Sequence, residues 1–233
     1  MSRSPKPAVD VGVALPVFNC ERYVVAALES VLAQTYPVSD VVVVDDGSAD
    51  TSYPLALGVG HPVRVVRQEH AGVGVARSRA VNLVRGEIVV LMDSDDLLTS
   101  DSIGTRLQVI LDNPDVDIVY GQIRSFTECV GGVPVPLDRP RPAHTPGAMM
   151  VRRSAFDRVG PFTAGLRVAE GLDWLLRAHE VGLREATVEE QVQWRRVHGA
   201  NNSLTQRGSL GELPRTLKAS LDRRRQTTAR DCR

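Results

Sequence analysis

The chain has 233 residues, of which 42% are hydrophobic, so it can bury one substantial core. Its 28 basic and 28 acidic residues cancel, which argues against a general nucleic-acid-binding protein. Its three cysteines lack disulfide-framework or metal-site spacing, and no apolar run reaches the length of a membrane span or signal-peptide core, so we expect a soluble, cytoplasmic protein.

The first half of the sequence alternates short apolar runs with helical periodicity. The apolar runs predict strands at residues 9–18, 41–44, 63–66, 88–92 and 116–120. Helices are expected at 23–34, around Pro54, between Gly74 and Gly86, and at 102–111. This alternation is typical of an α/β fold with a doubly wound, mostly parallel sheet and helices on both faces.

The second half is less regular. Residues 123–129 and 191–198 are predicted to be strands, and 152–159, 170–181 and 213–224 helices. The Pro-rich stretch at 133–146 is expected to be a loop over the sheet edge. We expect a disordered N-terminus at 1–8, one domain over 9–205, and a C-terminal helix with a basic tail over 206–233.

The strand at 88–92 ends in a cluster of acidic residues, Asp93, Asp95 and Asp96. Carboxylates crowded at the end of a buried strand repel one another unless a cation lies between them. Oxygen ligands at this spacing suit Mg²⁺ or Mn²⁺, whose remaining positions substrate phosphates can fill. Asp93-Ser94-Asp95 therefore predicts a metal and nucleotide site. The alternative is a charged turn in which Asp96 or Thr99 caps the next helix.

Two further strand ends are expected at the same edge of the sheet. The strand at 41–44 opens into Asp45 and Asp46, and the first strand ends at Phe18 and Asn19. Ligands of open α/β sheets bind outside the carboxyl ends of the strands. A nucleotide would find carboxylates for its base and ribose there, and Phe18 to pack against. The stretch 72–76 lacks the third glycine of a dinucleotide-binding loop.

Six short motifs occur in the order and spacing of family-2 glycosyltransferases. They are residues 16–19 (PVFN), 30–36 (SVLAQTY), 43–48 (VVDDGS), 76–77 (AR), 85–87 (RGE) and 91–96 (LMDSDD). On these motifs the chain resembles that family over about residues 9–205. The resemblance implies a GT-A fold, with a nucleotide-sugar-binding half at 9–120 and an acceptor-binding half at 121–205. It also implies an inverting transfer from a nucleotide-sugar, usually a UDP-sugar, to an acceptor hydroxyl.

The resemblance implies a nucleotide site at the strand ends of the first half. Its residues are Pro16, Val17, Phe18, Asp46, Arg77, Asp93 and Ser94. The backbone and ring at 16–18, together with Asp46, resemble the uracil site. Arg77 matches a position near the nucleotide, and Asp93 resembles the acid that contacts the ribose or supports the metal ligand.

The resemblance also implies a metal site. Asp95 matches the direct ligand of Mn²⁺ or Mg²⁺, which would neutralise the departing diphosphate. The late segment containing Arg195, Arg196 and His198 resembles an Arg-x-His segment of the family. It implies that His198 contacts the metal or the diphosphate, and that one of the two arginines contacts the phosphates.

The sequence departs from the family pattern at the general base. Many members carry a Glu-Asp pair there, but Gly171 occupies the place of the second acid. Glu170 and Asp173 lie three residues apart, so both can project from one helical face and either could accept the acceptor's proton. We favour Asp173, because neighbouring Trp174 can raise its pKa by desolvation and form a wall of the acceptor site. The alternative is that both acids stabilise the helix N-terminus, with Asp173 and Arg177 as an i,i+4 pair.

Two rival functions follow from these departures. The missing second acid is compatible with a catalytically silent nucleotide-sugar-binding module. A nucleotidyltransferase would use similar metal geometry, but the N-terminal region has no basic glycine-rich loop. The donor sugar and the acceptor stay open, the latter among a glycan, a lipid-linked precursor, a small molecule and a peptide. The basic tail from Arg215 onward could contact an anionic membrane or an acidic partner, although a solvated helix end is the simpler interpretation.

Overall fold

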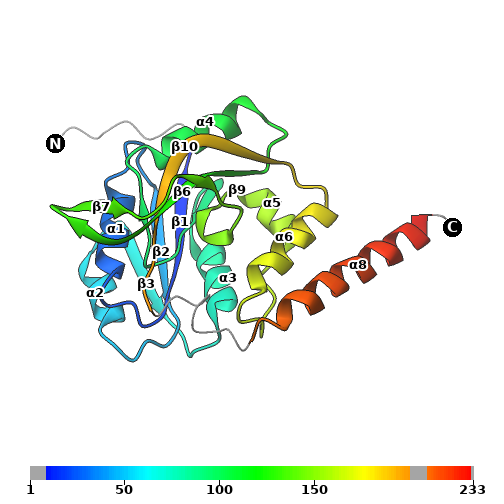
Figure 1. The fold of residues 1–233 in the computed structure, drawn as a ribbon, viewed down its shortest axis with the longest axis horizontal. Coiled ribbons are helices and arrows are strands. Elements are labelled where there is room, and N and C mark those ends of the chain that lie inside the picture. The colour runs from blue at the N-terminus through cyan, green and yellow to red at the C-terminus, as the bar shows by residue number, and fades with distance from the viewer. Residues whose placement is uncertain (1–8, 200–208, 232–233) are drawn as a thin grey trace.

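The computed structural model describes residues 9–199 and 209–231, and a mixed sheet with helices on both sides forms its centre (Figure 1). The strands run in the order β3-β2-β1-β4-β9-β6-β10-β5, and β7 and β8 pair with β6. Their bounds are β1 (Val11–Val17), β2 (Asp40–Asp45), β3 (Val63–Arg67), β4 (Ile88–Leu91), β5 (Leu97–Leu98), β6 (Ile118–Val130), β7 (Val133–Pro136), β8 (Arg141–Pro142), β9 (Met150–Arg152) and β10 (Glu185–Arg196).

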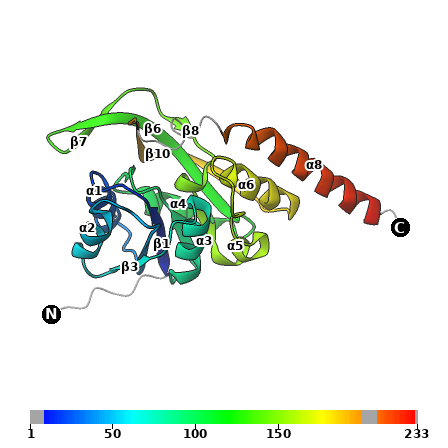
Figure 2. The same cartoon turned by 90° about the horizontal axis from the view of Figure 1, so that it is seen from below.

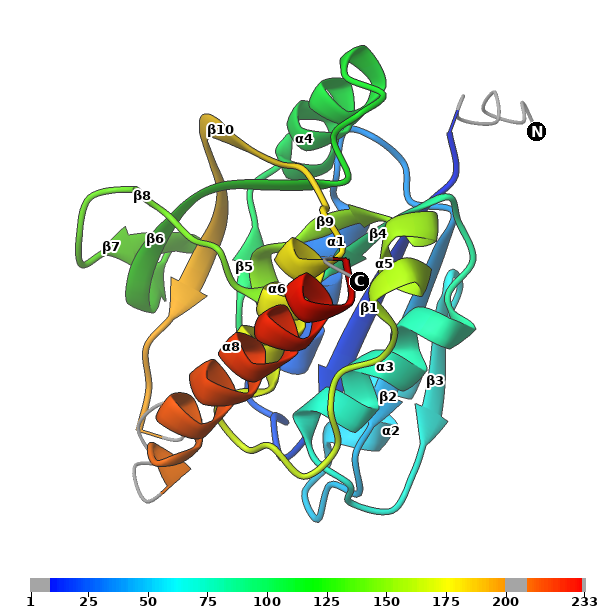
Figure 3. The ribbon, with the colours of Figure 1, turned by 90° about the vertical axis from the view of Figure 1, so that its right-hand side faces the viewer.

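The helices lie on the two faces and at one end of the sheet (Figures 1 and 2). They are α1 (Val24–Leu32), α2 (Ser52–Gly58), α3 (Val73–Leu83), α4 (Ser102–Asp112), α5 (Arg153–Val159), α6 (Glu170–Glu180) and α8 (Glu212–Asp231), with a short 3₁₀ helix η1 (Pro146–Ala148). Figure 3 looks onto the face covered by α3, α5 and α6, with α8 outside α6. Among the described residues, no helix is long and apolar enough to cross a membrane.

The apolar runs form strands because both faces of the sheet are covered. Val13 and Leu15 of β1 pack in the core beneath α1, α2 and α4, whereas Ala14 between them packs in the second core beneath α3, α5 and α6. β1 pairs in parallel with β2 and β4, and β2 pairs in parallel with β3. The prediction of a doubly wound, mostly parallel sheet is confirmed.

The second half differs from the sequence prediction in its strands. The strands predicted at 116–120 and 123–129 are one continuous strand, β6. The loop predicted at 133–146 contains β7 and β8, both antiparallel to β6. β10 begins at Glu185 rather than at 191, and the short strands β5 and β9 were not predicted. The expected disordered N-terminus at 1–8 lies outside the described residues.

The parallel strands bring their carboxyl ends to one edge of the sheet. The backbone N–H of Asp46, after β2, donates to the carbonyl of Val17 at the end of β1 at 2.8 Å. The backbone N–H of Met92, after β4, donates to the carbonyl of Ala14 at 3.2 Å. The three predicted site segments therefore follow neighbouring strands, β2, β1 and β4.

Candidate active site

The Asp93–Asp96 turn leaves β4 at the carboxyl edge of the sheet. Asp93 is the more exposed acid, with 42% of its side chain accessible, and its carboxylate accepts a hydrogen bond from Nη2 of Arg77 at 2.7 Å. The Cα of Gly147 in η1 lies against this carboxylate, and a Cβ there would overlap it. Asp93 is thus fixed from one side by α3 and from the other by the second half of the chain.

Asp95 lies beside a histidine from the other end of the chain. Nε2 of His198, just after β10, is 2.9 Å from a carboxylate oxygen of Asp95, and both side chains remain about one-fifth accessible, at 18% and 21%. Burial, followed by the neighbouring charge of Asp93, raises the pKa of Asp95. The carboxylate of Asp95 is a ligand for either Mn²⁺ or Mg²⁺, whereas the imidazole of His198 suits the transition metal Mn²⁺ better, and a cation there would relieve the repulsion between the acids.

The donor set at this turn is incomplete without a ligand. Within residues 9–199 and 209–231, no group of three or more His, Cys, Asp and Glu side chains is arranged to hold a metal ion. Mg²⁺-type sites commonly use one or two protein carboxylates and complete the shell with substrate phosphates and water. Asp95 fits that class of site, with the diphosphate of a nucleotide as a further ligand, and the nearby imidazole of His198 would favour Mn²⁺ over Mg²⁺.

Asp96 ties the turn to β10 rather than capping a helix. Its carboxylate accepts hydrogen bonds from Nε2 of Gln193 at 2.6 Å and from the backbone N–H of Arg196 at 2.8 Å. Burial, followed by the charges of Asp95 and Asp93, raises its pKa well above the usual range. The next helix, α4, has Asp101 at its N-cap without a side-chain capping bond, so neither Asp96 nor Thr99 caps it.

Arg77 joins this turn to the helix that carries the two candidate bases. It is 4% exposed, and its Nη1 contacts Glu170 at 3.2 Å while its Nη2 contacts Asp93. Its guanidinium also lies over the ring of Phe162 at 5.4 Å. Burial lowers the pKa of Arg77, but Asp93 and Glu170 raise it more, so the side chain is held as a cation. Glu170 can come this close because its stem packs against Gly74 of α3.

The two candidate bases have different surroundings. The carboxylate of Asp173 accepts hydrogen bonds from Oγ1 of Thr163 at 2.7 Å and from Nε of Arg177 at 2.9 Å, and Arg223 of α8 lies 3.8 Å away. These are the contacts of a buried structural ion pair. Only Glu170 is directly connected, through Arg77, to the Asp93 turn.

Trp174 lies in the core rather than on the wall of an acceptor site. The ring is fully buried, stacks on Phe156 at a centroid distance of 5.4 Å and contacts Phe162 at 5.6 Å. Its indole N–H donates to the carbonyl of Gly160 at 2.8 Å. Because no face of the ring is accessible, Trp174 supports the position of α6 and would reach an acceptor only if this core opened.

Gly171 is packed against the second half of the chain. A Cβ at this position would lie 2.8 Å from Cδ and 2.9 Å from Cγ of Pro146 in η1. The place that holds a second acid in many family members is therefore occupied here by a proline ring from another segment. Sequence reasoning identified the glycine but not the proline, because 25 residues and no shared motif separate them.

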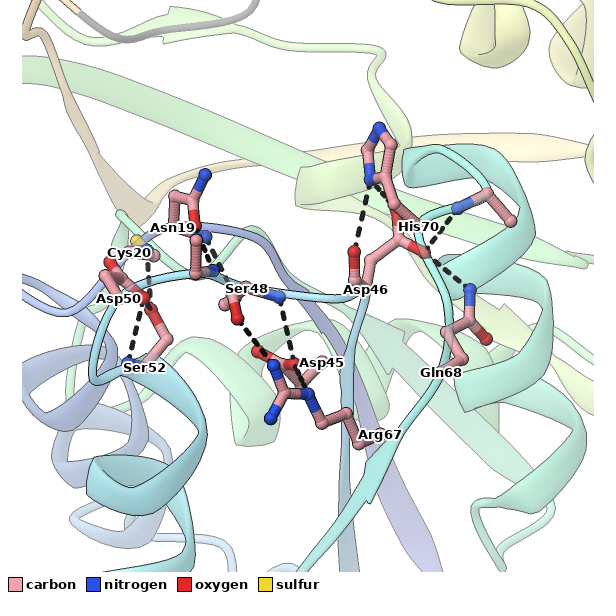
Figure 4. A network of polar contacts seen from close by, with 12 residues as sticks. Asn19, Cys20, Asp45, Asp46, Ser48, Asp50, Ser52, Arg67, Gln68 and His70 are labelled. Carbon is pink, nitrogen blue, oxygen red and sulfur yellow. Dashed lines mark hydrogen bonds and ion pairs between the residues drawn. The ribbon is translucent and has the colours of Figure 1, made fainter.

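The predicted uracil site is built around Asp46 (Figure 4). Its Oδ1 accepts hydrogen bonds from Gln68 Nε2 at 2.7 Å and from the Ala71 N–H at 2.9 Å. Its Oδ2 accepts from the Gly72 N–H at 2.9 Å and lies 2.9 Å from Nδ1 of His70. Nδ1 of His70 also lies 3.1 Å from the backbone carbonyl oxygen of Asp46. Asp46 therefore fixes the loop after β3, and its direct contact with a base stays a prediction.

Two rings form an aromatic surface at this edge. Phe18 and His70 stack with their centroids 4.3 Å apart, and they are 46% and 58% accessible. The side chains of Pro16 and Val17, by contrast, are buried in β1, so these two residues offer only backbone groups. Sequence reasoning missed His70; its signal is that it follows β3, the parallel neighbour of β2, at the same edge.

Ser94 is also buried beneath this edge. It is 8% exposed, and its carbonyl accepts the thiol of Cys20 at an S···O distance of 3.4 Å. Burial raises the pKa of Cys20 to about 12, so the thiol is neutral at physiological pH. Ser94 thus connects the end of β1 to the acidic turn.

A cavity of about 360 Å³ opens beside the acidic turn and joins the two halves of the molecule. Asp93 and Asp96 line it from the first half, and Arg141, His144 and Arg195 line it from the second. Nε2 of His144 is 3.1 Å from the hydroxyl of Thr187 in β10. The space next to Asp93 therefore has acidic groups at one side and basic groups at the other.

Comparison with known sequences shows several similar proteins. A family model described as glycosyl transferase family 2 matches residues 12–171. The chain is 35% identical over 124 residues to glycosyltransferase GlyA of Streptococcus pneumoniae serotype 4, which covers 52% of this chain and 18% of that protein. It is 38% identical over 119 residues to the chondroitin synthase of Escherichia coli, covering 50% of this chain and 17% of that protein. The chain thus spans less than a fifth of the length of either relative.

Two solved structures share the fold. The structure of S. aureus TarS 1–349 in complex with UDP-GlcNAc aligns with a TM-score of 0.70 at 20% identity, over 84% of this chain and 61% of that one. The mannosyltransferase PcManGT from Pyrobaculum calidifontis, in complex with GDP-Man and Mn²⁺, aligns with a TM-score of 0.66 at 21% identity, over 85% of this chain and 61% of that one. Both likenesses concern the architecture of the sheet and its helices, and they confirm the GT-A-like prediction.

Proposed function

Because the chain belongs to glycosyl transferase family 2, we propose that it transfers a sugar, with inversion, from a UDP-sugar to an acceptor hydroxyl. The observation that supports this most is the chain of contacts Asp93–Arg77–Glu170. It joins a carboxylate able to take the acceptor's proton to the acidic turn that suits a metal and a diphosphate. The complex of the structural neighbour TarS with UDP-GlcNAc supports a uridine nucleotide as donor.

Binding of the donor would use the carboxyl edge of the sheet. Phe18 and His70 present accessible ring faces on which a nucleobase can stack. Asp46 acts through its hydrogen bonds to the loop after β3, because it sets the position of His70. Asp93 would lie near the ribose, as the family resemblance implies.

The diphosphate would bind at the turn after β4. Asp95 and His198 are the residues that would hold a divalent cation, Mn²⁺ or Mg²⁺. When bound, such a cation neutralises negative charge that develops on the departing diphosphate. Asp96 keeps the turn attached to β10 and so keeps His198, which follows β10, beside Asp95.

The general base proposed here is Glu170, in preference to Asp173. An inverting transfer needs one carboxylate within hydrogen-bond reach of the acceptor hydroxyl. Glu170 contacts Arg77 beside the Asp93 turn, whereas Asp173 is engaged by Thr163 and Arg177. In this arrangement Arg77 positions Glu170 and Asp93 relative to each other.

The test is a donor-hydrolysis and transfer assay with a panel of nucleotide-sugars in the presence of Mn²⁺. Release of UDP, together with product of inverted anomeric configuration by NMR, is expected for at least one UDP-sugar. A retained configuration, or turnover only with another nucleotide, would refute the corresponding part of the proposal.

A second candidate function is binding of a nucleotide-sugar without transfer. The observation that favours it is the packing of Gly171 against Pro146, which leaves no room for the second acid found in many relatives. Calorimetric binding of UDP-sugars with no UDP release at long incubation would favour this candidate. Any turnover that Glu170→Gln removes would exclude it.

A further inference from the structure

The C-terminal helix α8 is attached to the rest of the chain through polar side chains. Thr216 and Ser220 face inward and are 5% and 3% exposed. Oγ of Ser220 donates to Glu180 of α6 at 2.5 Å, and Nε of Arg223 donates to the same carboxylate at 2.7 Å. Glu212 accepts hydrogen bonds from two backbone N–H groups just before α6. The inner face of α8 is therefore a hydrogen-bonded and ion-paired surface.

Two leucines of α8 face outward, whereas Leu213 in its first turn is half-buried. Leu217 and Leu221, one helical turn apart, are 47% and 54% exposed, and Leu210, seven residues before Leu217, is 50% exposed. Lys218 and Arg225, also seven residues apart, lie exposed on the adjoining stripe. A helix packed on a globular domain normally turns its apolar face to the core. α8 instead turns Leu217 and Leu221 outward, so the described part of the chain leaves these two side chains largely accessible.

We propose that the outer face of α8, made of Leu217, Leu221, Lys218 and Arg225, binds an anionic lipid surface, together with Leu210 in the turn just before the helix. A leucine stripe flanked by lysine and arginine is the pattern of helices that lie in the plane of a membrane interface. The apolar side chains enter the acyl boundary, and the cations meet the acidic headgroups. Figures 2 and 3 show α8 at the outside of the molecule with α6 beneath it, so a flat surface can approach it.

The positive charge of this face favours an anionic lipid surface over a second copy of the chain as its binding partner. Two copies pairing through the same face would bring two like stripes together, each with Lys218 and Arg225 and the half-buried Asp222 between them, and their net positive charges repel. An anionic lipid surface is attracted to them instead. This docking is independent of the proposed sugar transfer, because none of these residues lies at the acidic turn or the carboxyl edge of the sheet.

The experiment is co-sedimentation of the full chain with vesicles. Binding is expected to vesicles of equimolar phosphatidylglycerol and phosphatidylcholine and not to pure phosphatidylcholine, and it should weaken as salt is raised. The double variant Leu217→Glu/Leu221→Glu should bind about tenfold less or weaker still, and Lys218→Glu/Arg225→Glu should lose binding similarly. The matched control Leu55→Glu/Leu57→Glu, which alters two leucines of α2 that are 38% and 54% exposed, should bind like the wild type.

Donor hydrolysis without vesicles should be the same for all these variants, which separates this test from that of the proposed function. Equal binding of wild type and Leu217→Glu/Leu221→Glu would overturn the proposal, as would no binding to anionic vesicles. A dimer seen by light scattering and abolished by the same double variant, without vesicle binding, would instead assign the face to a second copy. Capture of an acidic protein without vesicle binding would overturn it as well.

Discussion

The two halves of the molecule differ in how far apart in the sequence their contacting residues lie and in how their strands pair. In the first half, contacts at the site join segments close in sequence, such as Asp46 and Gly72, which are 26 residues apart. Contacts between the first and second halves join distant segments instead: Asp95 and His198 are 103 residues apart. β1 to β4 form a parallel block, whereas β6 pairs with β7, β8 and β9 in antiparallel fashion. The nucleotide-binding edge is thus formed mainly by residues close in sequence in the first half. Residues of the second half, such as His198, add to it although they are distant in sequence.

Because of this difference, a sequence motif predicts the contacts of a side chain better in the first half than in the second. Glu170 and Asp173 lie on the same helix and could not be separated by spacing. Their contacts differ: Glu170 meets Arg77, 93 residues earlier, whereas Asp173 meets Arg177, four residues later. A catalytic role in the second half therefore depends on which distant segment a residue contacts.

The largest expected effect comes from breaking the contact between the halves at Asp95. Asp95→Ala should remove metal-dependent donor binding and lower kcat/KM on the order of 10³-fold, because the cation loses its carboxylate. Removal of metal with EDTA should reproduce the loss in the wild type. Isothermal calorimetry with UDP, with and without Mn²⁺, measures the binding.

The matched control for this variant is Asp115→Ala, an exposed acid that pairs with Arg184 at 2.9 Å away from the site. It should bind and turn over donor like the wild type. Equal UDP affinity with and without EDTA would contradict the assignment of Asp95, and unfolding of Asp95→Ala would indicate a structural role instead. Asp93→Asn should weaken donor binding less, because its carboxamide can still accept from Arg77.

The second prediction compares the two acids of α6. Glu170→Gln should lower turnover on the order of 10²-fold with the donor KM nearly unchanged, because the acceptor's proton loses its base. Asp173→Asn should keep most of the activity and instead lower the melting temperature, because it weakens the bonds to Thr163 and Arg177. Steady-state kinetics and thermal unfolding of both variants measure this. An inactive Asp173→Asn beside an active Glu170→Gln would reverse the roles.

The first half was predictable from the sequence because each strand is covered on both faces and ends where its motif begins. Ile88 to Leu91 is fully buried, so an unbroken apolar run sufficed to predict β4. The acidic turn follows directly, and topology alone then places it beside the ends of β1 and β2. The predictions of the α/β sheet and of a polar carboxyl edge needed no long-range information.

The second half was less predictable because its strands form through pairing with neighbouring strands and have no clear pattern of apolar residues in the sequence. Gly121 lies inside β6, between the two shorter strands that the sequence predicted at 116–120 and 123–129. It is required because a Cβ there would lie 2.6 Å from the side chain of Val192 in β10. Likewise Met150–Arg152 is a strand only because β4 and β6 flank it. The contact of Gly171 with Pro146 cannot be predicted from the residues next to either position.

The third prediction tests the locally built edge. Asp46→Ala should weaken UDP binding by about 1–3 kcal/mol, because the backbone amides of Ala71 and Gly72 lose their acceptor and His70 loses its position. His70→Ala should weaken it by about 0.5–1.5 kcal/mol, the range of an aromatic contact. Glu69→Ala, a change to an exposed neighbour in the same loop, serves as the control. Calorimetry that finds UDP affinity unchanged in both variants would place the base elsewhere.

The smallest expected effect concerns stability and compares the acids at the starts of two strands, β2 and β6. Asp40 begins β2 and accepts two hydrogen bonds from Arg64, at 2.9 and 2.6 Å, and one from the Arg85 N–H at 2.8 Å. Asp117, just before β6, accepts from the Arg184 N–H at 3.0 Å and from Arg158 at 3.3 Å. Because Arg64 is 43% accessible, we expect Asp40→Asn to lower the free energy of unfolding by only about 1 kcal/mol.

The pH dependence of this effect follows from the pKa of Asp40. Burial raises that pKa, but the hydrogen bonds from Arg64 and Arg85 lower it more, so it lies below its usual range in the folded chain. The stabilisation is therefore fully present above the unfolded pKa of about 3.9 and is lost as the pH falls through the folded pKa. Urea-unfolding midpoints of the wild type and Asp40→Asn should differ at neutral pH and converge in acid. A difference in unfolding midpoint that stays constant with pH would contradict the ion pair. Asp117→Asn, measured in the same way, shows whether the acid just before β6 stabilises the fold as much as Asp40 does.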